Sequence, residues 1–373
     1  MNRRRLTLIV AVTLAAGCGG AEDVPSPAGP DDGIEVAAPE SAGLRPDVLA
    51  GLNQALIDQS FPDTTSVLVL KDGKLLVESY FAGGGPEVLN DTRSAMKSVT
   101  ALAVGTALAA GALQSIDDPA FAGLADLAPF AHDGPLKQQI TLADFLSMSS
   151  ALDCNDWNEA SPGNEENMYP LDDWSRWAVD IPLKADYQRD ETGRGPFSYC
   201  TAGVFLLGQI VERAVGVPVD QYVDRALLGP LGITHREWTR SPRGQTMTGG
   251  GLRLRSRDLA KLGLLVATGG RWREQQLVPQ DWMNNVLSVW RNVDAEQDYG
   301  LLFWRRQYRS PCGPLAGWYM GGNGGNVVVY VPDHSIVVVV TRRHYNQPGM
   351  HQQTVSLLEN HVLAALTCST SAG

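Results

Sequence analysis

Ser94 and Lys97 are the residues whose types and spacing point most directly to chemistry. They stand three positions apart at the head of an almost wholly apolar segment, RSAMKSVTALAVGTALAAGAL. Residues three apart on a helix share a face, so the amine can reach the hydroxyl, and the unpaired N–H groups at the helix start can stabilise a developing anion. Apolar surroundings lower the pKa of a lysine, which can then accept the serine proton. The spacing predicts a nucleophilic serine activated by a lysine, without a histidine.

The setting of this pair favours catalysis over the alternative of an exposed serine beside a lysine that extends to water. S-x-x-K occurs once in the chain, and it opens an Ala/Leu/Val segment that follows a predicted hairpin. Other catalytic patterns, namely G-x-S-x-G, H-E-x-x-H and the P-loop, do not occur. We predict no cofactor and no metal, because the histidines lack ligand spacing and are expected to be surface or structural residues. They are His132, His235, His334, His344, His351 and His361.

An acidic segment with interleaved tryptophans, LDCNDWNEASPGNEENMYPLDDWSRW, allows two interpretations. The more common one is a solvated loop; the other is a rim that selects cationic, amine-bearing substrates. A calcium site lacks the necessary loop spacing. The carboxylates are those of Asp153, Asp156, Glu159, Glu165, Glu166, Asp172 and Asp173.

The elements that would position these residues are indicated by hydrophobic patterning. Helical spacing predicts helices near 45–59, 140–148, 202–216, 256–270 and 353–366, the fourth running from a serine cap to a glycine stop. Strand patterns occur near 65–81, with a turn at Asp72-Gly73, and near 326–343, with a turn at Pro332-Asp333. Strands thus cluster at both ends of the chain. We predict an α/β (α+β) fold in which an antiparallel sheet from both termini is flanked by helices, with a mostly helical insertion at roughly 100–250.

The N-terminus, MNRRRLTLIVAVTLAAGCGG, has the basic start, apolar run and small residues of an export signal. LAAGC resembles a bacterial lipoprotein cleavage box, although Leu14 is one place further from Cys18 than is common. We expect a signal at 1–18, lipidation of Cys18, a tether at 19–34 and one domain at 35–373, hence an anchored protein of the cell envelope. Ordinary secretion and an uncleaved anchor are the alternatives.

Charge and cysteine count restrict the partners and the compartment. Removal of the three signal arginines takes the formal net charge from −11 to −14, which disfavours a nucleic-acid partner. Apart from Cys18, the chain has four cysteines, an even number that suits an oxidising compartment. We favour a disulfide between Cys154 and Cys200, but the sequence leaves the other two connectivities open.

The motifs, in their order, resemble the serine β-lactamase and penicillin-binding-protein superfamily. The resemblance extends from about Glu35 to Leu366 and is greatest to the branch of class C-like β-lactamases, esterases and 6-aminohexanoate-dimer hydrolases. Ser94-Ala95-Met96-Lys97 matches the first motif, FSYCTAG supplies Tyr199 as the tyrosine of the second, and Asn323-Gly324-Gly325 matches the third.

This resemblance implies a role for each matched residue. Ser94 would form an acyl-enzyme, Lys97 would take or shuttle its proton, and Tyr199 would protonate the leaving group and later activate water. Which of the two is the primary base stays open, and outside the motif Tyr199 would read as a half-buried aromatic at a helix start. Asn323, Gly324 and Gly325 are expected on a strand beside Ser94, where the N–H of Asn326 would complete the oxyanion hole.

Two departures bear on the substrate that the resemblance implies. Asn323 stands where many relatives carry Lys or His, and Thr201 replaces the asparagine of Tyr-x-Asn, which would hold a side-chain carbonyl. Both departures favour a small ester or amide substrate over a carboxylated β-lactam, with a peptide as the alternative substrate. D,D-peptidase, D-aminopeptidase and β-lactamase activity are the alternatives within this fold, and a cell-envelope binding protein without turnover is the alternative from another class.

Overall fold

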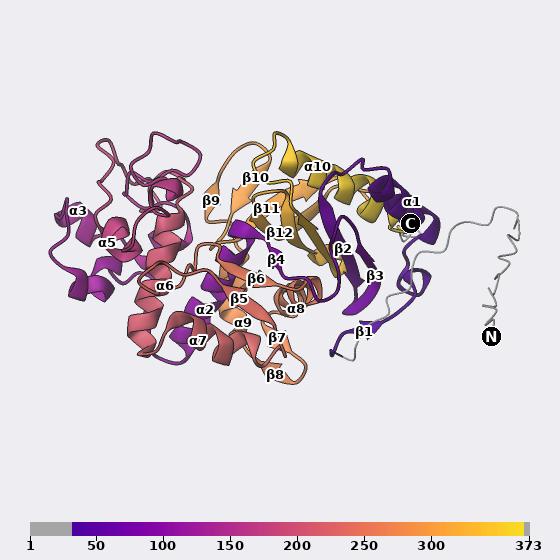
Figure 1. Ribbon diagram of the computed structural model, residues 1–373, viewed down its shortest axis with the longest axis horizontal. Helices are drawn as coiled ribbons and strands as arrows, with labels where there is room; N and C mark the ends of the chain where they lie inside the picture. The colour runs from indigo at the N-terminus through magenta and orange to yellow at the C-terminus, as the bar shows by residue number, and fades with distance from the viewer. Residues whose placement is uncertain (1–31, 369–373) are drawn as a thin grey trace, which may run out of the picture.

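Strands from both ends of the chain meet in one sheet in the computed structural model, which describes residues 32–368 (Figure 1). The strand order is β1-β3-β2-β14-β13-β12-β11-β10-β9. Every neighbouring pair is antiparallel except the edge pair β1 and β3, which is parallel. The strands are β1 (Glu35–Val36), β2 (Thr64–Lys71), β3 (Lys74–Tyr80), β9 (Arg291–Asn292), β10 (Gln297–Tyr299), β11 (Trp304–Tyr308), β12 (Leu315–Gly322), β13 (Asn326–Val331) and β14 (Ile336–Arg342).

The predicted fold class is confirmed by this sheet and its covering helices. Helix α8 packs on one face, while α1 and α10 pack on the other (Figure 1). The helices are α1 (Pro46–Ile57), α2 (Lys97–Ala109), α3 (Pro135–Gln138), α4 (Leu142–Leu146), α5 (Trp174–Val179), α6 (Thr201–Val215), α7 (Val219–Val223), α8 (Ser256–Ala267), α9 (Gln280–Val286) and α10 (Met350–Leu357).

The strand sequences explain why both faces of the sheet are covered. Successive side chains on a strand point to opposite faces, so Val337 and Val339 of β14 enter one core while Val338 and Val340 enter the other. A strand that is apolar at every position can bury both sets only between two layers of helices. The first hairpin turns at Asp72-Gly73, as predicted, with both residues at positive φ.

Several elements differ from the sequence-based expectations. Helix α8 has no serine cap, because the Ser256 hydroxyl instead bonds Ser66 at 2.7 Å. The C-terminal helix α10 continues beyond Leu357 as two short irregular turns that end at Ala365. Asn323-Gly324-Gly325 forms the turn between β12 and β13 rather than part of a strand, because two of its three residues are glycines at positive φ.

The helical part of the chain lies beside the sheet and holds the segment after Ser94 (Figure 1). Helix α2 packs against α6, and all its residues from Lys97 to Ala107 are buried. The Trp282 ring lies so close to Gly105 that an added Cβ would come within 2.1 Å of it, and its indole N–H donates to the Ala101 carbonyl at 2.9 Å. These contacts fix α2, and thereby Lys97, within the core.

Three small strands and one hairpin complete the described part. They are β4 (Asn90–Asp91), β5 (Arg236–Trp238) and β6 (Leu252–Leu254) in one sheet, and β7 (Arg271–Trp272) with β8 (Gln275–Gln276) in another.

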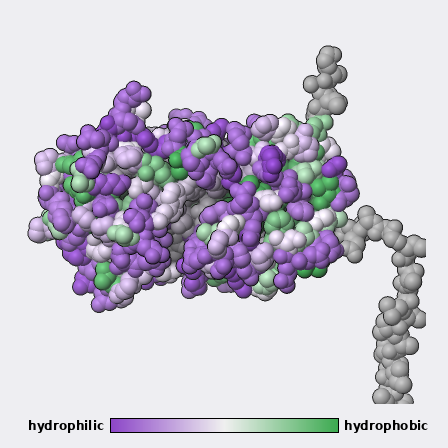
Figure 2. Space-filling view, turned by 90° about the horizontal axis from the view of Figure 1, so that it is seen from above, coloured by the Kyte–Doolittle hydropathy of each residue, from purple (hydrophilic) through white to green (hydrophobic). Residues whose placement is uncertain are grey.

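The face seen in Figure 2 is mainly hydrophilic, with hydrophobic residues in small scattered groups. Among residues 32–368 no single helix is long and apolar enough to cross a membrane, although α6 and the bent segment after it meet that test together by length and composition. The predicted signal and Cys18 lie outside the described residues.

Candidate active site

Ser94 lies in η2 (Arg93–Met96), a short 3-10 turn that leads directly into α2. The residue before it, Arg93, has a φ of 53°, a left-handed conformation that is uncommon for a residue other than glycine. The Asp91 carboxylate supports this turn, because it accepts the Arg93 N–H at 3.2 Å and pairs with its guanidinium at 3.3 Å. The serine is thereby presented at the start of a buried helix.

Lys97 meets Ser94 as its spacing predicts. The Lys97 Nζ lies 2.7 Å from the Ser94 Oγ and donates to the Gly249 carbonyl at 2.6 Å. Only 1% of the lysine is exposed. Burial lowers the pKa of Lys97, an effect that the nearby carboxylates of Glu165 and Asp156 oppose. The amine therefore stands beside the hydroxyl with a reduced affinity for its proton.

Tyr199 is the third residue of the predicted catalytic group. It directly precedes Cys200, the residue that caps helix α6. The Lys97 Nζ lies 5.1 Å from the centre of its ring, and the tyrosine lines the same cavity as Ser94. Burial raises the pKa of Tyr199, the hydrogen bond with Ser94 lowers it, and the Asp156 and Glu165 carboxylates raise it further. The phenol is accordingly protonated near neutral pH. The structure brings together the three residues predicted for catalysis.

The strand beside Ser94 is β12, which corrects the expected position of the third motif. A Cβ added to Gly322 would lie 1.9 Å from the Thr92 carbonyl and 2.9 Å from the Ala95 nitrogen, so glycine is required for this approach. Two cavities lie at Ser94: a larger one described below, and a second one that Arg93, Gly250 and Tyr345 also line. Asn323, the residue after Gly322, lines both. The Asn323 side-chain amide donates a hydrogen bond to the Asn346 side chain and accepts one from the Asn346 backbone N–H; neither residue belongs to a strand.

Asn326, expected to supply an oxyanion N–H, is placed elsewhere. It lies on β13, is 1% exposed and lines neither cavity at Ser94. Its side chain instead joins two chain segments, because it accepts the Arg342 N–H at 2.7 Å and donates to the Arg342 carbonyl at 3.0 Å. The structure therefore does not bring Asn326 to Ser94, because the glycine turn places Asn323 rather than Asn326 at the end of the strand that approaches the serine.

Thr201 and the turn glycines have structural positions. Thr201 was expected to bind substrate. It is fully buried at the start of α6 and lines neither cavity, so the structure does not place it at a substrate site. Its backbone N–H donates to the Asp156 carboxylate at 2.7 Å. Gly324 and Gly325, both at positive φ, allow the turn after β12 and pack against Tyr345 and Thr354.

A cavity of about 470 Å³ opens at Ser94. Four stacked rings form one wall: Tyr199 stacks on Trp157 with ring centres 5.4 Å apart and on Trp304 at 5.6 Å, and Trp304 stacks on Tyr319 at 6.2 Å. The charged side chains of the lining are three carboxylates and one guanidinium, and the imidazole of His351 also lines the cavity. The lining consists of Ser94, Asp156, Trp157, Glu165, Tyr199, Glu296, Gln297, Trp304, Arg306, Tyr319, Gly321, Gly322, Asn323, Met350, His351 and Gln352.

Asp156 and Glu165 are the two members of the acidic segment that line the 470 Å³ cavity with Ser94. The Asp156 carboxylate accepts the N–H groups of Thr201 at 2.7 Å and Glu165 at 3.0 Å. Burial and the Glu165 charge raise the pKa of Asp156 to about 6, although Lys97 and the bonds to Thr201 act in the opposite direction. The segment is therefore not only a solvated loop, because part of it forms a wall of the cavity.

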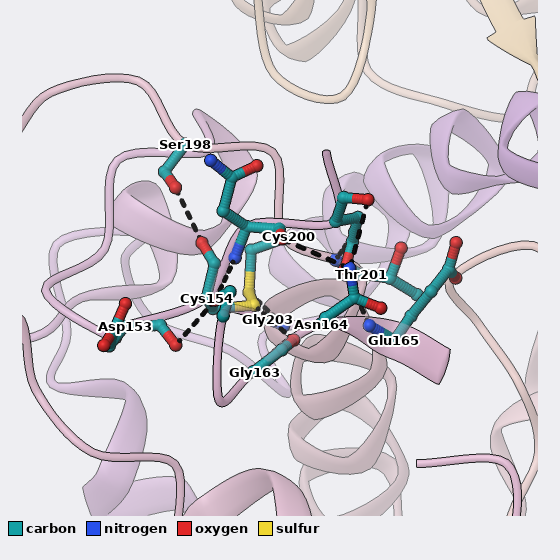
Figure 3. The surroundings of a disulfide bond; sticks show 12 residues. Asp153, Cys154, Gly163, Asn164, Glu165, Ser198, Cys200, Thr201 and Gly203 are labelled. Carbon is teal, nitrogen blue, oxygen red and sulfur yellow. Dashed lines mark hydrogen bonds between the residues drawn. A yellow bond between two sulfur atoms is a disulfide. The ribbon is translucent and has the colours of Figure 1, made fainter. Parts of the chain in front are cut away.

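The structure contains the favoured disulfide between Cys154 and Cys200 (Figure 3). Cys200 directly follows Tyr199 in the chain. A second disulfide joins Cys312 and Cys368, and Cys312 packs against the second of the two hydrophobic cores, whereas Cys154 and Cys200 belong to the first. Within the described residues, no group of three or more histidine, cysteine, aspartate or glutamate side chains could hold a metal ion.

Several lining residues were not anticipated from the sequence. Trp304 and Arg306 come from β11, Tyr319 comes from β12, and Glu296 comes from the loop between β9 and β10. Their strands are short or rich in arginine and glycine, so their patterns gave no strand prediction. The pairing of β11 with β12 is what brings these side chains to Ser94.

Comparisons with known proteins agree with this arrangement. Residues 55–359 match the model of the beta-lactamase family. A 6-aminohexanoate-dimer hydrolase of Paenarthrobacter ureafaciens is 28% identical over 271 residues, which cover 71% of this chain and 66% of the relative, slightly less than two thirds of its length.

Solved structures show the same fold at low sequence identity. A D-stereospecific amidohydrolase from Streptomyces sp. superposes with a TM-score of 0.63 at 17% identity, covering 83% of this chain and 98% of its own. EstCE1, a hydrolase with promiscuous acyltransferase activity, has a TM-score of 0.64 at 16% identity, covering 84% and 97%. With the family model matching most of its length, this chain belongs to the beta-lactamase family, as its motifs predicted.

Proposed function

We propose that the chain is a serine hydrolase that cleaves small esters or amides through an acyl-Ser94 intermediate. The observation that carries this proposal is the buried Lys97 amine 2.7 Å from the Ser94 hydroxyl. The Ser94 oxygen attacks the carbonyl carbon while its proton passes to Lys97, and collapse of the tetrahedral adduct breaks the bond to the leaving group. Water then cleaves the acyl-serine ester, releasing the acid and restoring the hydroxyl.

The opposite pKa shifts favour Lys97 as the primary base and Tyr199 as the acid. Burial makes a neutral amine easier to form and makes a phenolate harder to form. Tyr199, protonated and lining the same cavity as Ser94, can donate to the leaving group. In deacylation, the same two groups can take a proton from the attacking water and return one to the Ser94 oxygen.

The backbone N–H groups of Ser94 and Asn323 are our candidates for the oxyanion hole. Asn323 follows Gly322, the residue of β12 that approaches the turn carrying Ser94. Beyond Tyr319, β12 has no partner on its β11 side, since β11 begins at Trp304, the residue paired with Tyr319. The end of β12 can therefore offer backbone groups to a substrate carbonyl.

The cavity favours an amine-bearing substrate over an anionic one. Asp156, Glu165 and Glu296 contribute three carboxylates against the single guanidinium of Arg306, which is itself paired with Glu296 at 3.0 Å. The stacked aromatic wall can add cation–π attraction. The similarity to a 6-aminohexanoate-dimer hydrolase is consistent with cleavage of an amide, while Asn323 supplies no positive charge for a β-lactam carboxylate.

A substrate panel tests this function. We expect purified protein to hydrolyse p-nitrophenyl esters, with aminoacyl esters preferred over alkanoyl esters of equal length, and expect Ser94→Ala to abolish turnover. Nitrocefin, D-Ala-D-Ala peptides and the 6-aminohexanoate dimer separate the β-lactamase, D,D-peptidase and amidase alternatives. Folded protein that turns over none of these substrates would instead indicate the binding protein without turnover.

Export and lipid anchoring through Cys18 are a separate proposal, supported by the basic and apolar N-terminal sequence. Expressed in a bacterium, the full chain should fractionate with membranes, and the Cys18→Ser variant should not. Equal fractionation of the two proteins would refute the anchor.

A further inference from the structure

Residues 154–157 run alongside residues 198–201, the segment that carries Tyr199. The Cys154–Cys200 disulfide joins the two segments with Cα atoms 5.4 Å apart (Figure 3). Hydrogen bonds lie on both sides of it: the Ser198 hydroxyl donates to the Cys154 carbonyl at 2.6 Å, and the Asp156 N–H donates to the Tyr199 carbonyl at 2.9 Å. We call these two segments and their disulfide the brace.

The brace substitutes for regular structure at Tyr199. The chain has no helix or strand from residue 194 to residue 200, and α6 begins only at Thr201. The Cys200 sulfur accepts the Gly203 N–H at 3.4 Å and so also caps that helix. The Trp157 ring, although 62% exposed, stacks on the Tyr199 ring with an angle of 5° between planes. One short segment therefore supports both the backbone and the ring of Tyr199.

The brace also places charge at the proposed catalytic groups. Asp156 is anchored to α6 through the Thr201 N–H and to the acidic segment through the Glu165 N–H. The carboxylates of Asp156 and Glu165 act on both Lys97 and Tyr199, in each case raising the pKa. Displacing residues 154–157 would therefore move a general acid and change the proton affinity of the base.

We propose that the Cys154–Cys200 disulfide is a positioning element for the reaction, holding Tyr199 and Asp156 against Ser94 and Lys97. This inference rests on the proposed function. Without the disulfide, residues 154–157, whose tryptophan is exposed, would separate from residues 198–201 part of the time. Even a small displacement of a catalytic group lowers the reaction rate strongly. Because such disulfides persist in oxidising compartments, the enzyme reaches full activity only where this bond can form.

The chain provides a matched control in its other disulfide. We compare Cys154→Ala/Cys200→Ala with Cys312→Ala/Cys368→Ala, each in the full chain and each lacking one disulfide. The first variant should lose about a hundredfold in kcat with a smaller change in KM. Its rising pH limb should move to lower pH, because Lys97 loses carboxylates that raise its pKa. The control variant should keep the wild-type kcat and pH profile.

A second measurement covers the case in which the first variant does not fold. In the folded Cys312→Ala/Cys368→Ala protein, a phosphine reductant opens only the brace disulfide, and kcat should fall as it does in the variant. Unchanged kcat with two free thiols at Cys154 and Cys200 would overturn the inference, as would an equal loss in both double variants. Failure of the proposed function looks different, because oxidised wild-type protein would then be inactive throughout the substrate panel.

Discussion

Burial has opposite consequences for Lys97 and Tyr199. It favours the neutral form of each group, which for lysine is the base and for tyrosine the acid. Asp156 and Glu165 limit the effect on the lysine, because their charges favour the ammonium. In the proposed mechanism, burial and these two carboxylates together determine the pH at which Lys97 can activate Ser94.

This balance predicts a shift in the pH profile. If Lys97 must be neutral, kcat/KM rises with pH through the lysine pKa. Since Asp156 raises that pKa, Asp156→Asn should lower it and move the rising limb to lower pH. Initial rates with a p-nitrophenyl ester across the acidic and neutral range measure the limb. Glu159→Gln, in the same segment but outside the cavity, should leave it in place; movement to higher pH in Asp156→Asn would contradict the assignment.

At this scale the sequence predicted Ser94, Lys97 and Tyr199, because each stands in a local motif whose spacing limits its position. It could not show which of seven nearby carboxylates face the cavity, since that depends on how an irregular loop folds against α6. The same limit applies to Asn323 and Asn326, which only the turn between β12 and β13 distinguishes.

The contact between β12 and the turn carrying Ser94 is the element-level feature on which the site depends. No side chain fits between Gly322 and the Thr92 carbonyl, so strand and turn touch through their backbones. The predicted hairpins β2–β3 and β13–β14 were evident from Val-rich and Leu-rich runs on both sides of turn residues. Strands β9 to β11 could not be predicted, because they are short. In Trp304–Tyr308, for example, consecutive charged and polar side chains hide the alternation of apolar and polar residues that is typical of a strand.

Gly322→Ala tests this contact. The new methyl group should push β12 away from Ser94 and reduce kcat/KM by about a hundredfold, since reaction geometry tolerates little displacement. Gly73→Ala is the matched control at a hairpin turn with open space around it, although its φ is +80°. It should cost about 1 kcal/mol of stability and leave activity unchanged. Thermal melts and ester hydrolysis distinguish the two; full activity in Gly322→Ala would contradict the model of the contact.

The two ends of the described chain close on each other. The Arg45 N–H donates to the Ala365 carbonyl at 2.8 Å, and the Thr367 N–H donates to the Gly43 carbonyl at 3.2 Å. The Cys312–Cys368 disulfide then ties the C-terminal segment to the loop between β11 and β12. The fold class could be predicted because strands lie at both ends of the sequence. The contacts between residues 43–45 and 365–367 could not, because they depend on tertiary packing that no local sequence pattern indicates.

Removing the second disulfide should therefore affect stability and not catalysis. Its loop spans 56 residues, and releasing it increases the conformational freedom of the unfolded chain. Cys312→Ala/Cys368→Ala should lower the free energy of unfolding by about 2–5 kcal/mol. Urea denaturation of the oxidised proteins measures the difference, and an unchanged midpoint would show that the closure contributes little.

Covalent labelling of Ser94 tests the central claim most directly. A fluorophosphonate reports an activated serine, because the oxygen displaces fluoride from phosphorus only when its proton can leave. Mass spectrometry of the folded protein should place one adduct on Ser94, with labelling absent in Ser94→Ala and slowed by orders of magnitude in Lys97→Ala. Folded wild-type protein that stays unlabelled, or that labels equally fast without Lys97, would contradict activation of the serine by the buried amine.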